Sequence, residues 1–511
     1  MRHHSKQPFS YETAVFATVT LILIGIAFAP FDIGGYRLLA DLILFAVATT
    51  WIVRAFFHKK FWVFSVMEPR GIFYFLGSVF ETTHFNSQFD KLKHHKILDL
   101  LCELGTVAGF GAVGVDFFWG SKLKKKSHRV LLFIISVIIL GWLFGFLLNT
   151  NPLGNPLAKG DAVFYQFFFG LFGLAGFLIY ALFAQALDIL VKTFSGVRAC
   201  PGVAPVLPGI QTPNVPIFIP VEAWLSILAI LIIHEASHGF LSRRHNVPVE
   251  SSGLLLFGIL PIGAFVKPDE KKLGEINHKN QVRVYSAGPT SNLVSMIIVA
   301  ILAIAIAGFI INPTLGAAID KNNRDATLSV QITKIEKEFD LCGEKYPSPA
   351  YGALDENSTI VKINDKPIAT LSDALNALRS NPSEPKTFLL QKNGQVTQKT
   401  LSPNALGRFG INVKAIQNPQ HTTSLSLKIE SYAYGFVSSV TFWFVFLSFL
   451  VAIANFMPFG PIDGGRMVVL LCQPYFGWLN MNEQQTQTFI RRLFYWILIP
   501  LILINALPII L

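Results

Sequence analysis

Residues 221–239 read VEAWLSILAILIIHEASHG, and the rest of the chain is best understood from this stretch outward. Up to Ile233 the residues are almost all apolar, as in a membrane-crossing helix, which needs roughly 20 apolar residues. His234, Glu235 and His238 follow at the end of the run. Ionisable residues at membrane depth are costly and are functional by default, so the stretch predicts a site inside a membrane helix.

The spacing of these three residues points to metal chemistry. Residues four apart lie on the same face of a helix, so His234 and His238 can direct imidazole nitrogens at one ion. Glu235 can then reach a water beside that ion. This is the HExxH arrangement of zinc hydrolases. The pattern is short, and the alternative is a pair of histidines satisfied by backbone or water at a helix end.

A catalytic zinc usually takes three protein ligands, and Asp463 is the best candidate for the third. It lies in residues 455–466, NFMPFGPIDGGR. Prolines and glycines interrupt the helix here, and such backbone at membrane depth must line a protein cavity or water. The alternative role of Asp463 is to cap the helix that follows, and both roles can coexist.

A third segment, residues 286–292, reads SAGPTSN and opens the next apolar span. Asn292 is an uncharged amide at helix depth that can hold a substrate carbonyl or a tetrahedral oxyanion. The alternative is a hydrogen bond between helices, with the small residues allowing close packing.

Taken together, the three segments resemble the site-2 protease family of intramembrane zinc metalloproteases (peptidase M50-like), in its archaeal-type form. The family pattern is HExxH, then G-P-x-x-N, then N-x-x-P followed by D-G; Ile462 stands where the family usually has Leu. The resemblance implies one zinc ion per chain, an endopeptidase activity, and a β-like membrane element at residues 253–266. It implies these roles: Glu235 as the catalytic base, His234, His238 and Asp463 as metal ligands, and Asn292 and Asn455 as substrate or oxyanion contacts.

Composition agrees with a membrane protein. Of 511 residues, 52% are hydrophobic and 14% are charged, against about 25% charged in soluble domains. The net charge of +11 comes from basic residues in short loops, as expected for anchored cytoplasmic loops, so no nucleic-acid partner is expected. The four cysteines form no CxxC pair, and we expect neither a disulfide framework nor a cysteine zinc site.

The apolar runs predict a polytopic α-helical membrane protein with about eight crossings. The basic N-terminus, with no cleavage site after it, predicts a retained first helix. The basic clusters cannot all fall on one side, so a segment near 100–119 or 162–193 is expected to be re-entrant or miscounted, and 61–80 and 100–119 are doubtful as spans. The predicted spans are 13–30, 36–57, 130–148, 162–187, 221–241, 284–311, 436–457 and 489–511.

Residues 320–418 are polar and long enough for a small α/β domain inserted between spans. Strands are expected at 328–335, 359–363 and 387–391, a hairpin turn at 364–367, and a helix from Ser372, its N-cap candidate, to Arg379. The insert resembles a PDZ domain, although residues 352–357, GALDEN, replace the usual G-L-x-x-G-D. That resemblance implies a groove for a peptide or a substrate ectodomain. The basic flanks of the neighbouring spans predict an extracytoplasmic domain.

These observations divide the chain into four regions: a multi-helix membrane region (1–194), two halves of the protease core (221–311 and 432–511), and the PDZ-like insert (320–418). The predicted protein is a multi-pass protein of the cell membrane that cleaves transmembrane protein substrates within the lipid bilayer, in regulated intramembrane proteolysis. The alternatives are a membrane transporter or a non-catalytic membrane scaffold with a metal site.

Overall fold

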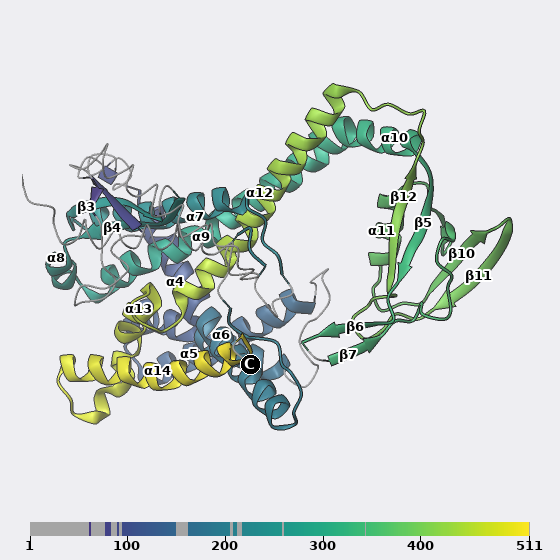
Figure 1. Cartoon of the computed structure of the whole chain (residues 1–511). Coiled ribbons are helices and arrows are strands. Elements are labelled where there is room, and N and C mark those ends of the chain that lie inside the picture. The colour runs from purple at the N-terminus through teal and green to yellow at the C-terminus, as the bar shows by residue number, and fades with distance from the viewer. Residues whose placement is uncertain are drawn as a thin grey trace, which may run out of the picture. The chain divides into compact units, whose positions relative to one another are not determined.

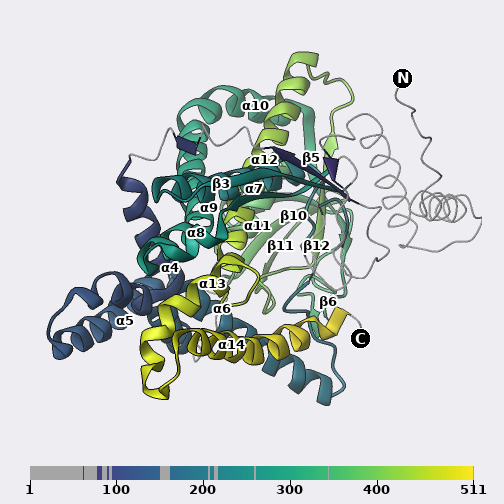
Figure 2. The same ribbon diagram turned by 90° about the vertical axis from the view of Figure 1, so that its left-hand side faces the viewer.

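The computed structural model describes the parts of the chain that follow: residues 61–62, 77–82, 89–90, 95–149, 162–204, 208–211, 217–257, 260–342 and 344–509. The chain divides into two compact units (Figures 1 and 2). Unit 1 consists of Met1–Leu178, Leu225–Ser295 and Phe446–Phe494, and unit 2 of Ile179–Trp224, Met296–Val445 and Tyr495–Leu511.

Seven helices in the described part are long and apolar enough to cross a membrane. These helices are α4 (Ile97–Phe118), α5 (Lys126–Asn149), α6 (Ala162–Phe194), α7 (Ala223–Arg244), α9 (His278–Ile306), α12 (Leu425–Phe456) and α14 (Glu483–Ala506). They confirm the helices expected from residue 130 onward, and the chain is an integral membrane protein with a β domain. The expected spans 13–30 and 36–57 lie outside the described residues. The doubtful segment 61–80 contains strands at both ends, β1 (Phe61–Trp62) and β2 (Gly77–Thr82).

Helix α4 is broken in its middle. Phe110 (φ −129°, ψ 16°) and Gly111 (φ 54°, ψ −137°) leave the helical region, and Gly111 adopts a positive φ that a side chain would disfavour. A Cβ on Gly114 would lie 2.9 Å from the carbonyl oxygen of Thr106, whereas eight residues span about 12 Å in a continuous helix. The chain therefore turns back on itself at this point, and the re-entrant segment expected near 100–119 stays a prediction.

Helix α6 repeats this feature. Phe172 and Gly173 have nearly the same dihedral angles, with φ 56° and ψ −143° at the glycine. A Cβ on Gly176 would lie 2.1 Å from the carbonyl oxygen of Phe168, again eight residues back. A Cβ on Gly111 would lie 2.7 Å from the backbone nitrogen of Gly173, so the two turns meet backbone to backbone. Both read F-G-x-x-G in the sequence.

Unit 1 also contains a four-stranded sheet with the strand order β1-β2-β3-β4. Strands β3 (Val249–Phe257) and β4 (Leu260–Pro268) form an antiparallel hairpin that follows α7. It ends in the short helix α8 (Glu270–Glu275), whose N-cap Asp269 accepts a bond from the Lys272 amide. Strand β4 is at the edge of this sheet within the described residues.

Unit 2 carries the β domain, whose main sheet has the order β11-β10-β8-β5-β12, with β9 paired to β8. Its core is formed by the buried side chains of Ile332, Ile360, Ile363 and Phe388. Three strand predictions are confirmed by β5, β8 and β10. The strands and helix are β5 (Thr327–Ile335), β6 (Glu338–Leu341), β7 (Glu344–Pro347), β8 (Thr359–Ile363), β9 (Lys366–Pro367), α11 (Leu371–Arg379), β10 (Lys386–Lys392), β11 (Gln395–Leu401) and β12 (Ile411–Gln417).

The turn and helix of this domain follow the expected pattern with one correction. Asn364, at φ 53°, begins the tight turn between β8 and β9. The N-cap of α11 is Thr370 rather than Ser372. The Thr370 hydroxyl accepts a bond from the Asp373 amide, and the Asp373 carboxylate accepts one from the Thr370 amide. This reciprocal pair is a capping box, and it decides where the helix begins.

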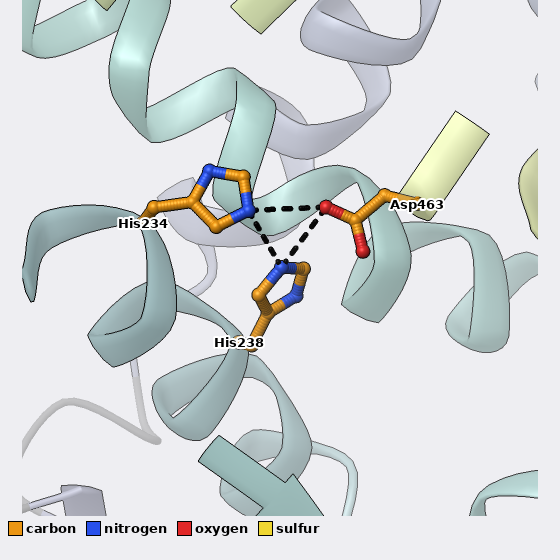
Figure 3. Close-up of side chains that lie close together, drawn as sticks. All are labelled: His234, His238 and Asp463. Carbon is orange, nitrogen blue, oxygen red and sulfur yellow. Dashed lines mark hydrogen bonds and ion pairs between the residues drawn. The ribbon is translucent and has the colours of Figure 1, made fainter. Parts of the chain in front are cut away.

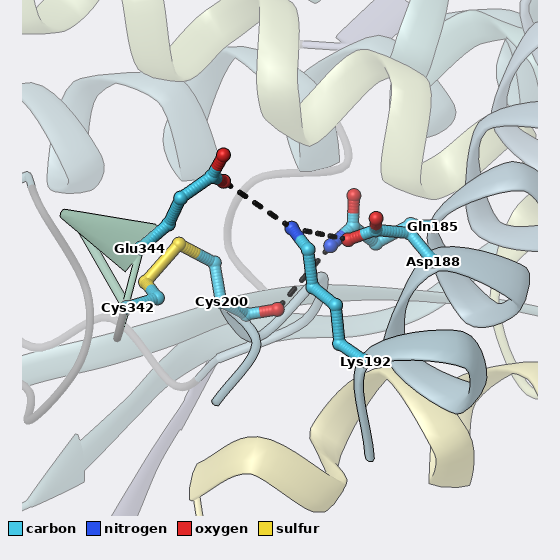
Figure 4. The surroundings of a disulfide bond; sticks show 6 residues. All are labelled: Gln185, Asp188, Lys192, Cys200, Cys342 and Glu344. Carbon is cyan, nitrogen blue, oxygen red and sulfur yellow. Dashed lines mark hydrogen bonds and ion pairs between the residues drawn. A yellow bond between two sulfur atoms is a disulfide. The ribbon is translucent and has the colours of Figure 1, made fainter. Parts of the chain in front are cut away.

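The expectation that the cysteines form no disulfide is wrong. Cys200 and Cys342 are bonded across 142 residues of sequence, with their Cα atoms 5.0 Å apart. The bond ties the turn between β6 and β7 to the segment after α6 (Figure 4). Lys192 lies beside the disulfide, with its Nζ 3.0 Å from Asp188 Oδ2 and 3.9 Å from Glu344 Oε2. Because only the fold brings the two cysteines together, their spacing in the sequence carries no signal.

Candidate metal centre

Helices α7 and α13 (Asp463–Cys472) bring three of the predicted residues to one point. His234 Nε2 lies 3.1 Å from Asp463 Oδ2, and His238 Nε2 lies 3.2 Å from the same oxygen. The two imidazole nitrogens are 3.3 Å apart. Figure 3 shows the two rings and the carboxylate pointing toward a common centre.

These separations fit a single tetrahedral metal ion. Zinc bonds to nitrogen and oxygen of roughly 2.0–2.1 Å place neighbouring ligands of a tetrahedron about 3.3 Å apart. His238 Nδ1 lies 2.8 Å from the carbonyl oxygen of Val284, so Nδ1 carries the proton and Nε2 presents its lone pair. Lone pairs of two imidazoles and a carboxylate oxygen repel one another unless a cation lies between them.

Gly288 on α9 leaves the space that such an ion needs. A Cβ at this position would lie 2.4 Å from His234 Nε2 and 2.5 Å from His238 Nε2. The glycine backbone therefore packs directly against both imidazoles. Any side chain at this position would displace the ligands or occupy the place of the ion.

Asp463 is delivered by a sharp connection between α12 and α13. A Cβ on Gly464 would lie 2.3 Å from the Met457 carbonyl oxygen, and one on Gly465 would lie 2.3 Å from the Gly460 nitrogen. Only glycine fits both approaches. The residue at the N-cap of α13 is Ile462, so the carboxylate of Asp463 is directed at the histidines rather than used as the cap.

Glu235 is held by the sheet beside the site. Its Oε2 accepts a hydrogen bond of 2.9 Å from the backbone nitrogen of Val266 on β4. The bond fixes one carboxylate oxygen and leaves the other available. Since Val266 acts through its backbone, the sequence pattern gives no hint of this partner.

Asn292 is fully buried and lies against a ligand. Its Nδ2 is 2.9 Å from His234 Nδ1, the ring nitrogen that faces away from the metal position. With a metal ion on Nε2, His234 Nδ1 carries the ring proton. A half-turn of the amide brings Oδ1, which has no hydrogen-bond partner among the described residues, into place to accept that proton and orient the ring. Its predicted contact with substrate or oxyanion stays a prediction. Asn455 donates its Nδ2 to the carbonyl oxygen of Val451, one turn back in its own helix, at 2.9 Å.

Comparison with known proteins agrees with this geometry. The profile of "Peptidase family M50" matches residues 222–501, more than half of the chain. An uncharacterized protein of Methanocaldococcus jannaschii is 30% identical over 261 residues, covering 49% of this chain and 58% of that protein. A "probable protease eep" of Enterococcus faecalis is 25% identical over 161 residues, covering 24% of this chain and 38% of that protein. The chain thus matches less than two thirds of the length of either relative. The extent of the family match, with the converging His234, His238 and Asp463, places this chain in peptidase family M50, a family of zinc metalloproteases.

Proposed function

We propose that this protein is a zinc-dependent endopeptidase that cleaves transmembrane segments of other membrane proteins, in the manner of a site-2 protease. The convergence of His234, His238 and Asp463 carries the proposal. His234 and His238 lie on α7, a candidate membrane span, and Asp463 begins α13. Glu235 is adjacent in sequence to the first ligand, and the family match is to peptidase family M50. Its substrates are then transmembrane segments of proteins in the bilayer rather than soluble peptides.

The chemistry divides between the ion and the chain. His234, His238 and Asp463 would hold the zinc ion, which would polarise the scissile carbonyl and lower the pKa of a water toward about 7. Glu235 takes the proton of the attacking water at its carboxylate and delivers it to the leaving amine. The Val266 amide keeps that carboxylate oriented, and Asn292 keeps the His234 ring in place.

The substrate must be extended at the point of cleavage. Carbonyl groups within a helix already accept hydrogen bonds from their own chain, so a transmembrane helix has to unwind before it is attacked. Strand β4 is an edge strand in the described part, because β3 pairs with it on one side only. An unwound segment can add to this edge as a further strand, next to the glutamate bound by Val266.

The β domain of unit 2 is proposed to be a PDZ-like, extracytoplasmic module that docks or filters the ectodomains of substrates. The disulfide between Cys200 and Cys342 supports this placement, because disulfides persist in oxidising compartments. Basic residues at the end of α7, Arg243 and Arg244, support a cytoplasmic end for that helix. The membrane in question is proposed to be the cell membrane, and the process regulated intramembrane proteolysis.

A transporter is the main alternative, since it also places ionisable residues in the membrane. Within the described part, the buried or half-buried carboxylates of α4 are paired with arginines: Asp99 with Arg244, Glu103 with Arg283, and Asp116 with Arg129. Paired charges of this kind hold helices together and do not form a pathway for an ion or a proton. A non-catalytic scaffold would not need Glu235 beside the ligands.

The test is cleavage of a transmembrane substrate by the purified, zinc-loaded chain in detergent, compared with Glu235→Gln. The variant should keep one zinc ion per chain and lose cleavage by a factor of about 10²–10⁴, the usual contribution of a general base. Zinc at one ion per chain without proteolysis in the wild type would support the transporter or scaffold. Full cleavage by Glu235→Gln would exclude the proposed mechanism.

A further inference from the structure

A basic cavity of about 480 Å³ lies in unit 1 where α4, α5, α9 and α13 approach one another. Asp116 and Ser121 line it from the end of α4 and the turn that follows, and Arg129 lines it from the start of α5. Lys279 and Arg283 line it from the first turns of α9. None of these residues belongs to the metal centre.

Arg129 is fixed so that part of its guanidinium faces the cavity. Its Nε and Nη2 bond the two oxygens of Asp116 at 2.6 and 2.5 Å, and this pair holds the guanidinium at the wall of the cavity. The Tyr475 hydroxyl donates to Asp116 Oδ2 at 2.6 Å. Burial, followed by the bond to Asp116, raises the pKa of Tyr475, so this hydroxyl remains a donor. The carboxylate of Asp116 is therefore already engaged on both oxygens.

Of the two cations of α9, Lys279 is the less completely balanced. Lys279 Nζ donates to the Phe118 carbonyl oxygen at 2.9 Å and to Ser121 Oγ at 3.0 Å. Both acceptors are uncharged, and no carboxylate of the described residues lies within ion-pair distance of Lys279. Arg283 pairs with Glu103, so the three cations around the cavity face two carboxylates. Four more lysines follow in the adjoining turn and the start of α5, at positions 122, 124, 125 and 126.

An apolar surface begins directly beside this charge. After Arg129, α5 exposes Val130 (57%), Leu131 (56%), Ile134 (50%) and Ile138 (63%). An apolar helix face of this kind contacts the acyl chains of the bilayer. A molecule with an anionic head and apolar tails would match both parts, and basic pockets between membrane helices take anionic lipid headgroups.

We propose that this cavity binds the phosphate of an anionic lipid headgroup through Arg129, Lys279 and Arg283, with the acyl chains along α5. The phosphate oxygens accept charge-assisted hydrogen bonds from these side chains. Binding joins α4 and α5 to α9 and thereby stabilises unit 1. The same chemistry would accept free inorganic phosphate, and the apolar face of α5 favours the lipid.

The test uses the full chain, delipidated in a neutral detergent, with the thermal unfolding midpoint as the readout. Dioctanoyl phosphatidylglycerol, dioctanoyl phosphatidylcholine and inorganic phosphate are added separately. A ligand of the folded state raises the midpoint in proportion to its occupancy. Phosphatidylglycerol should raise the midpoint most, inorganic phosphate should raise it less, and phosphatidylcholine should leave it unchanged. An equal shift with phosphatidylcholine overturns the proposal, and a shift with phosphate that phosphatidylglycerol does not exceed overturns the lipid assignment.

Two variants locate the effect in the cavity. Lys279→Gln should weaken phosphatidylglycerol binding by about tenfold, the loss of one charge-assisted bond, and Lys279→Arg should restore it. Ser121→Asp, on the exposed turn after α4, adds a carboxylate without removing a cation and should abolish the shift. Lys271→Gln, on the exposed face of α8, is the matched control and should respond like the wild type. Wild-type responses from both Lys279→Gln and Ser121→Asp would overturn the proposal.

Discussion

Helices α7 and α4 both belong to unit 1, and they serve the metal centre in opposite ways. Helix α7 supplies chemistry, since two of its imidazoles meet the Asp463 carboxylate. Helix α4 has carboxylates too, but Glu103 forms an ion pair with Arg283 and Asp116 forms one with Arg129. The role of an ionisable group in a membrane helix therefore depends on its partner: the histidines of α7 can bind a metal ion, whereas the carboxylates of α4 form ion pairs between helices.

Instead, α4 contributes by shape. A Cβ on Gly105 would lie 1.8 Å from the Oγ1 of Thr290, and one on Gly109 would lie 2.2 Å from the ring of Phe456. Thr290 stands two residues before Asn292, and Phe456 ends the helix that leads to Asp463. The two glycines thus let α4 pack directly behind the segments that complete the site.

The largest expected effect concerns the ligand that comes from outside α7. Asp463→Ala should lower zinc affinity by more than about 100-fold, because loss of a ligand exceeds the roughly 10–100-fold cost of losing a ligand's supporting partner. Metal content after dialysis against a chelator of known affinity measures this. If the variant kept the zinc content of the wild type, Asp463 would not be a metal ligand, and His234 and His238 on α7 would be the ligands that remain from this set.

Gly288→Ala tests whether shape at the site matters as much as ligand identity. The added methyl would lie within 2.5 Å of both Nε2 atoms, and an overpacking cost of up to about 3 kcal/mol corresponds to about 100-fold in zinc affinity. The same chelator competition gives the value. Unchanged affinity would show that the imidazoles can move aside.

Asn292→Ala asks whether the amide orients His234 or contacts the substrate. Loss of the contact to His234 Nδ1 should weaken zinc binding by about tenfold, within the range for a ligand's supporting partner. A drop in cleavage with unchanged zinc affinity would favour the substrate role instead. Asn455→Ala should have the smaller effect, because its amide is bonded to Val451.

The smallest effect on the site is expected from α4. Gly109→Ala should cost about 1–3 kcal/mol of stability, because Phe456 is fully buried and cannot yield to solvent. Zinc affinity should fall only modestly. Unfolding in detergent measures the stability, and chelator competition measures the zinc affinity. Gly435→Ala on α12 is the control and should not destabilise the protein, because no atom of the described residues outside its own helix backbone lies within 4 Å of the new Cβ.

Local patterns predicted local structure well. The strands β5, β8 and β10 and the candidate membrane helices from α5 onward could be predicted, because hydrophobic periodicity depends on neighbouring residues. The short helices α8 and α10 (Ala317–Ala326) were not predicted. The N-cap of α11 moved from Ser372 to Thr370 because the capping box with Asp373 decided it. The disulfide between Cys200 and Cys342 was missed, since no rule of spacing joins residues 142 positions apart.

The sequence by itself determined the metal-binding half-site on α7, because four-residue spacing on a helix places His234 and His238 on one face. It also predicted that this half-site lies on a membrane-crossing helix, because the residues before it are apolar. Only the tertiary structure decided that Asp463 reaches the histidines and that the Val266 amide holds Glu235. Such contacts join segments far apart in the chain, and they depend on close packing of backbone and glycine, which leaves no periodic trace in the sequence.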